Sequence, residues 1–120
     1  MTTVRENEAS IQFEGLGTGA YEIFGGTQAN FLLSVPGRSA REVAVLVNDP
    51  SMEFLAERLG VENTQAFRDR AAEVIGRLWI TRALDQGLHL APAITISRNL
   101  LDQHPDFVAE VEAALRATVA

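Results

Sequence analysis

The chain has 120 residues, with 16 acidic and 10 basic side chains and a net charge of −6 at pH 7. An acidic balance disfavours non-specific binding to nucleic acids or to anionic membranes, because such binding needs a basic surface. The sequence contains no cysteine, which excludes disulfides, thiol catalysis and thiolate metal sites. All the basic residues are arginine, so Schiff-base chemistry on lysine is excluded as well.

The length and a hydrophobic fraction of 47% predict one globular domain with a substantial core. We expect residues 1–8 to form a disordered N-terminus and residues 9–120 to form the domain. No apolar run approaches the roughly 20 residues that span a bilayer. Because the chain has neither a signal peptide nor a need for disulfides, we expect a cytoplasmic protein.

Alternation of apolar and polar residues predicts strands near the N-terminus, at residues 10–14, 21–23 and 27–35. The pair Gly25-Gly26 suits a tight hairpin turn, since glycine readily adopts positive φ angles. We therefore predict a three-stranded antiparallel meander between about residues 9 and 35. We expect this sheet region to end at Pro36-Gly37, and the sheet to be apolar on one face and polar on the other.

Residues 40–47 allow two interpretations. Ser39 and Glu42 match a capping box, in which the glutamate reaches back to the cap, so we expect a short helix here. The following run VAVLV (43–47) is rich in β-branched residues, which favours a strand. The sequence leaves the choice between helix and strand open.

Two more helices are marked by start and stop residues. Asp49-Pro50 predicts a helix with Asp at the N-cap and Pro at the first position, ending before Gly60. A long central helix should begin at Asn63 or Thr64 and run to about Gln86.

The C-terminal third predicts one strand and one further helix. Residues 92–96 alternate as a strand does, and their proline suits a sheet edge. Ser97 can cap a short turn through Asp102, and His104-Pro105 starts the last helix. The fold class is therefore α+β: a small, mostly antiparallel sheet packed on a helical layer around the long central helix, in the order βββ-ααα-β-α.

The central helix is apolar on two sides, which is typical of a helix sandwiched between two layers. One side carries a stripe of small and apolar residues that could pack inside the chain or form an interface with a protein partner, either a second copy or another protein. The residues of this hypothetical interface are Ala72, Gly76, Trp79, Ile80 and Ala83.

Residues 54–68 resemble the helix-turn-helix pattern of bacterial DNA-binding regulators. The resemblance covers about 20 residues and rests on Ala56, Gly60 at the turn, its apolar neighbours, and Ala66. In that motif the start of the second helix enters the major groove. The resemblance implies that DNA would be contacted by Asn63, Thr64, Gln65 and Arg68.

Two other patterns are weak. Residues 15–20 (GLGTGA) fit the letters of a dinucleotide-binding loop, but the segment that follows reads as strand rather than the required helix. His104 with Asp102 and Asp106, and His89 elsewhere, could supply metal ligands, although these residue types also suit a helix start. We assign no catalytic, cofactor or metal residues and expect no cofactor.

The sequence thus favours a non-enzymatic, acidic protein-interaction module that self-associates or docks on a partner protein through apolar helix surface. The alternative is a DNA-binding transcriptional regulator that uses the corner at residues 54–68. No interaction with a membrane is expected.

Overall fold

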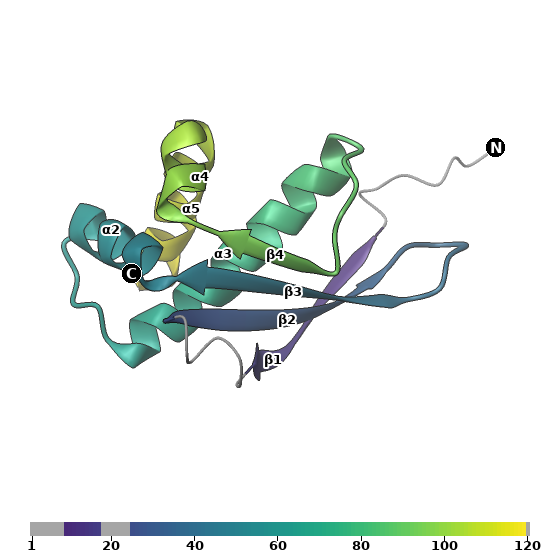
Figure 1. Ribbon diagram of the computed structural model, residues 1–120, viewed down its shortest axis with the longest axis horizontal. Helices are drawn as coiled ribbons and strands as arrows, with labels where there is room; N and C mark the ends of the chain where they lie inside the picture. The colour runs from purple at the N-terminus through teal and green to yellow at the C-terminus, as the bar shows by residue number, and fades with distance from the viewer. Residues whose placement is uncertain (1–8, 18–24, 120) are drawn as a thin grey trace.

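The computed structural model describes residues 9–17 and 25–119. Within these residues, one sheet has the order β1 (Ser10–Gly17), β2 (Gly26–Ser34), β3 (Arg41–Asn48) and β4 (Ala93–Ile96). The helices are α2 (Asp49–Leu59), α3 (Gln65–Asp85), α4 (Arg98–Gln103) and α5 (Pro105–Val119). Figure 1 shows α3 crossing behind the sheet, and α2 and α4 at the end where β3 and β4 stop. The fold is α+β, as predicted.

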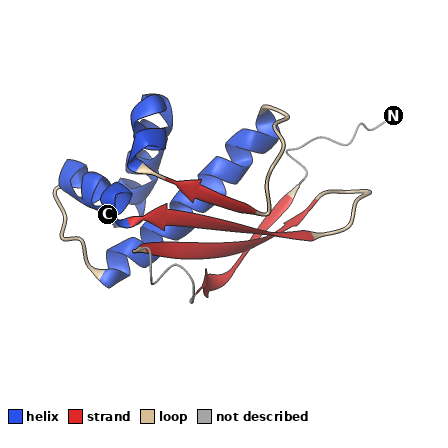
Figure 2. Cartoon of the chain, viewed as in Figure 1, coloured by secondary structure: helices blue, strands red, loops and turns tan. Residues whose placement is uncertain are grey.

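The sheet is mixed, with an antiparallel meander β1-β2-β3 and a parallel edge strand β4 beside β3. Its two faces differ in polarity, as expected. Phe31 and Val45 are fully buried on the face that meets the helices, whereas Gln28 and Asn30 on the opposite face are only partly buried. Figure 2 shows the four strands as one layer in front of the long helix.

The third strand of the meander is β3. The prediction of a short helix at residues 40–47 is wrong, because these residues belong to this strand. Pro36-Gly37 does not end the sheet but forms the turn between β2 and β3, in which the Arg38 N–H donates to the Val35 carbonyl at 3.0 Å. The β-branched residues of β3 pair with neighbours on both sides, and this burial outweighs the local capping signal. The strand predicted at residues 21–23 and the N-terminal residues 1–8 lie outside the described residues.

The other helices follow their local capping signals. α2 ends at Gly60, which has φ +68°, and its N-cap is Asn48, one residue before the predicted Asp49. α3 is capped by Thr64, whose hydroxyl oxygen accepts from the Phe67 N–H at 3.1 Å. The predicted turn after Ser97 is the helix α4, so the observed order is βββ-α-α-β-α-α.

The core lies between the sheet and α3, and α5 packs on another side of α3. Gly76 makes the closest approach of α3 to the sheet. A Cβ added at this position would lie 2.4 Å from Cε1 of Phe31 and 3.4 Å from Cβ of Val45. The glycine therefore lets the helix backbone rest directly on a buried aromatic ring.

This contact generates a stability prediction. We expect Gly76→Ala to lower the free energy of unfolding by about 1 kcal/mol, because overpacking a core costs roughly 1–3 kcal/mol and the gain in helix propensity recovers up to about 1 kcal/mol. Urea unfolding of the variant in the wild-type and Phe31→Leu backgrounds measures the contact. The substitution should cost less once the ring is gone, and an equal cost in both backgrounds would contradict the close approach.

Candidate functional site: an apolar groove at the α2–α3 corner

The residues predicted for a partner interface are mostly covered by the chain itself. Ala72 and Ile80 are fully buried, Ala83 is buried, and Gly76 rests on Phe31. Trp79 is partly exposed, and its ring makes edge contacts with Phe107 and His104. Four of the five residues therefore pack inside the chain, and Trp79 is the one member of the stripe that is partly exposed.

The surface of the α2–α3 corner is hollowed by an apolar groove of about 450 Å³. It forms where the end of α2, the first turns of α3 and the last part of α5 meet. Val61 is exposed there, although large apolar side chains are usually buried. We call this surface the corner groove; it is lined by Leu59, Val61, Glu62, Thr64, Ala66, Phe67, Arg70, Leu115 and Arg116.

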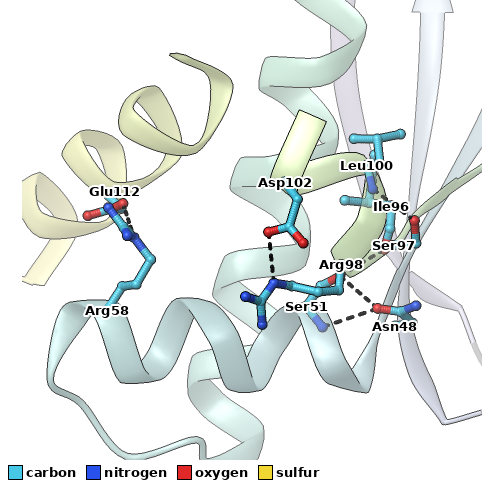
Figure 3. A network of polar contacts seen from close by, with 9 residues as sticks. All are labelled: Asn48, Ser51, Arg58, Ile96, Ser97, Arg98, Leu100, Asp102 and Glu112. Atoms are coloured by element: carbon cyan, nitrogen blue, oxygen red, sulfur yellow. Dashed lines mark hydrogen bonds and ion pairs between the residues drawn. The ribbon is translucent and has the colours of Figure 1, made fainter. Parts of the chain in front are cut away.

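An ion pair joins α2 to α5, and its carboxylate also contacts Arg116 in the lining of the corner groove. Nε of Arg58 lies 2.7 Å from a carboxylate oxygen of Glu112, which is only 7% exposed, and Arg116 lies 3.6 Å from the other oxygen. Burial of a charged side chain is unfavourable unless a partner compensates for the lost hydration. The pair seen in Figure 3 therefore joins α2 to α5, two of the elements that line the groove.

The corner itself is held by backbone contacts. The Val61 N–H donates to the Ala56 carbonyl at 3.0 Å, which closes the end of α2 around the left-handed Gly60. The chain then runs through residues 61–64 without regular structure before α3 begins. Val61 in this connection and Phe67 in the first turns of α3 both line the groove.

The rim of the corner groove carries charge of both signs. Arg116 shares the buried carboxylate of Glu112, and Glu62 is exposed. Arg70 is exposed and makes no hydrogen bond, ion pair or ring contact with any other residue that the structure describes. The groove therefore offers one guanidinium that has no partner among the described residues, beside an apolar floor.

The residues implied by the helix-turn-helix resemblance lie at the same corner. Asn63, Thr64 and Gln65 are exposed at the start of α3. Arg68 is turned back along the helix, where Nη1 donates to the Asn63 carbonyl at 2.7 Å and Nη2 donates to Oε1 of Gln65 at 3.0 Å. These bonds brace the corner and leave Arg68 less free to reach a base.

The carboxyl ends of the parallel strands β3 and β4 are occupied by a structural network. Such ends are a common place for ligand sites in α/β sheets. Here the Ser51 hydroxyl lies 2.6 Å from Oδ1 of Asn48 and 3.2 Å from the Ile96 carbonyl, and Ser97 caps α4 (Figure 3). These groups use one another as partners, so the network joins α2 to β4 rather than presenting open donors to a ligand.

Three of the candidate metal ligands are engaged by arginines or an aromatic ring, and the fourth, His89, is exposed in the loop after α3. Asp102 pairs with Arg98 at 3.1 Å, Asp106 pairs with Arg82, and the His104 ring stands against Trp79. Within residues 9–17 and 25–119, no group of three or more His, Cys, Asp or Glu side chains could hold a metal ion.

The start of the glycine-rich segment is strand rather than loop. Gly15 and Gly17 belong to β1, where the pairing with β2 shifts register between Phe13 and Gly15. Residues 18–20 of the segment lie outside the described residues. The cradle that a dinucleotide would need at this place begins with a paired strand, which does not fit the motif.

Comparisons of the chain with protein-family models, with curated proteins and with solved structures find no match. In the described part of the chain, no helix combines the length and apolar character needed to cross a membrane.

The Arg82–Asp106 pair generates a pH prediction. The hydrogen bond from Arg82 holds the pKa of Asp106 below its ordinary value of 3.8. A carboxyl whose folded-state pKa is lowered stabilises the fold above its unfolded pKa, and the stabilisation is lost as the pH falls through the lower folded pKa. Asp106→Asn should therefore lower the urea midpoint near neutral pH, and the difference from wild type should shrink below about pH 4.

Glu57→Gln is the control for this experiment, because Glu57 is exposed and forms no ion pair within the described residues. Its effect should be small throughout the same pH range. A stability difference for Asp106→Asn that stayed constant down to low pH would show that the ion pair is not its source.

Proposed function

We propose that this protein is a non-enzymatic interaction module that docks an amphipathic segment of a partner protein in the corner groove. The observation that carries the proposal is the combination of an apolar floor, with Val61 exposed, and the unengaged Arg70 at the rim. Apolar grooves of this kind bind amphipathic helices through side chains spaced at i, i+3 or i+4, and i+7.

The charges at the rim point to the chemistry of the partner. Arg70 would pair with a carboxylate on the docked segment, although the net charge of the chain itself is −6. Charge complementarity of this sort sets orientation and partner choice more than affinity. The expected partner is therefore a helix with apolar anchors on one face and an acidic residue beside them.

A second copy of the chain is the competing occupant. Native mass spectrometry of the purified protein separates the two possibilities, since a self-association surface would give clean multiples of the 13.1 kDa chain. A monomer leaves the groove available for a different protein, as proposed. A dimer that Val61→Glu dissociates would assign the groove to self-association instead.

Selection of helical peptides from a random display library tests docking directly. The wild-type protein should enrich amphipathic sequences that carry an acidic residue, and Val61→Glu should weaken their binding roughly tenfold or more, because a buried, unpaired charge in an apolar site is strongly unfavourable. Leu16→Glu is the matched control: Leu16 and Val61 are both 40% exposed, and Leu16 lies on β1 and is not part of the groove lining.

The result is read from the two variants together. The proposal requires that the enriched peptides lose affinity for Val61→Glu and keep it for Leu16→Glu. No enrichment, or the same loss in both variants, would rule out docking in the corner groove. Circular dichroism and urea unfolding of each variant show whether the fold is intact.

DNA binding is the alternative proposal for the same corner, supported by the exposure of Asn63, Thr64 and Gln65 at a helix start. It predicts duplex binding that falls steeply with salt. Arg68→Ala should weaken this binding, and its salt dependence should become smaller if Arg68 contacts a phosphate. Arg98→Ala, on α4, is the control. Absence of duplex binding even at low salt would eliminate this alternative.

A further inference from the structure

A second hollow lies at the opposite end of α3, between the β2–β3 turn and the loop of residues 87–90. Its volume is about 760 Å³, which is within the range of about 300–1,000 Å³ that is usual for small-molecule sites. We call it the arginine pocket; the lining residues that matter for its chemistry are Leu33, Val35, Arg38, Arg41, Leu88 and His89.

The lining of the arginine pocket has no acidic residue. It contains Arg38, Arg41 and His89 but neither Asp nor Glu, on a chain in which acidic residues outnumber basic ones by 16 to 10. A local excess of cationic side chains creates a potential that favours an anion. The pocket therefore differs in charge from the molecule as a whole.

The two guanidinium groups are presented differently. Nη1 of Arg41 donates to the Leu90 carbonyl at 3.0 Å, which fixes this side chain across the pocket. The Arg38 side chain has no partner among the described residues, while its backbone N–H is held in the β2–β3 turn by the Val35 carbonyl. The turn thus fixes the base of Arg38 and leaves its charged end available.

Apolar side chains line the same hollow as the cationic ones. Leu33, Val35 and Leu84 line the hollow, and Leu88 stands at its edge with 55% of its surface exposed. Leu88 is the most exposed of the large hydrophobic side chains in the described part of the chain. A ligand that covered it would remove apolar surface from water, which is favourable in proportion to the area buried.

We propose that the arginine pocket binds a small anionic amphiphile, with a carboxylate or phosphate head on Arg38 and Arg41 and an aliphatic part against Leu88 and the adjoining apolar walls. Both head groups accept charge-assisted hydrogen bonds from guanidinium in the same way. The site is separate from the corner groove, and neither proposal depends on the other.

Isothermal titration with decanoate, decyl phosphate, decanol and decyltrimethylammonium, each below its aggregation concentration, tests the proposal. At least one of the two anions should bind, and their relative affinities identify the head group. The uncharged and cationic compounds share the aliphatic chain and should bind much more weakly. Equal binding of all four compounds, or of none, would overturn the proposal.

Arg38→Gln tests the role of the free guanidinium without removing a contact that holds the fold together. We expect the variant to bind the anion roughly tenfold more weakly, because one charge-assisted hydrogen bond is lost. Arg98→Gln is the control, since Arg98 is an exposed arginine that lines neither the arginine pocket nor the corner groove. An equal loss in both variants would indicate a general charge effect and would overturn the site.

Leu88→Ser tests the apolar half of the same site. It should weaken decanoate binding and reduce the difference between decanoate and acetate, since the shorter anion has no chain to cover the leucine. If decanoate and acetate bind the wild type equally, the pocket does not recognise an amphiphile. Urea unfolding of Leu88→Ser confirms that this exposed position can be changed with the fold intact.

Discussion

The contact between Gly76 and the ring of Phe31 determines how close α3 can come to the sheet. With a side chain at this position the helix would have to move outward, and the buried residues on either side would separate. At the present distance, Ala72 and Ile80 are fully covered and α5 can pack on another side of the same helix. The small residues of α3 are thus used inside the molecule, and the two hollows to which we assign binding lie at the ends of the helix.

The two ends of α3 present different chemistry because different segments meet there. At the N-terminal end, the ion pair of Arg58 with the buried Glu112 joins α2 to α5, and both helices contribute to the lining of an apolar groove. At the C-terminal end, the β2–β3 turn faces the loop after α3 and brings Arg38 and Arg41 together without an acidic neighbour in the lining. One rigid helix therefore fixes the positions of two independent surfaces.

Features that depend on neighbouring residues could be predicted from the sequence, and features that depend on distant ones could not. The stop at Gly60 is local and predicted correctly, and Thr64 is one of the two caps that the sequence allows for α3. Residues 41–48 were ambiguous because their pairing with β2 and β4 decides their structure. The apolar stripes of α3 were recognised, but a helical pattern does not say which stripe the sheet covers. The corner groove joins Leu59, Phe67 and Leu115 from three helices, so periodicity within one helix could not reveal it.

Every basic residue of the chain is an arginine, so the cationic groups at both candidate surfaces are guanidinium groups. A guanidinium can stack on a ring and donate in its own plane at the same time, which an ammonium cannot do. Arg77 lies over Phe31 while donating to the Ile11 carbonyl, and Arg98 lies 3.9 Å from the centroid of the Phe54 ring while pairing with Asp102. Among the arginines that the structure describes, only Arg38 and Arg70 have neither a side-chain hydrogen bond, nor an ion pair, nor a ring contact with another described residue. Because one lines the arginine pocket and the other the corner groove, the unpaired guanidinium groups occur where an external anion could take the place of an internal acceptor.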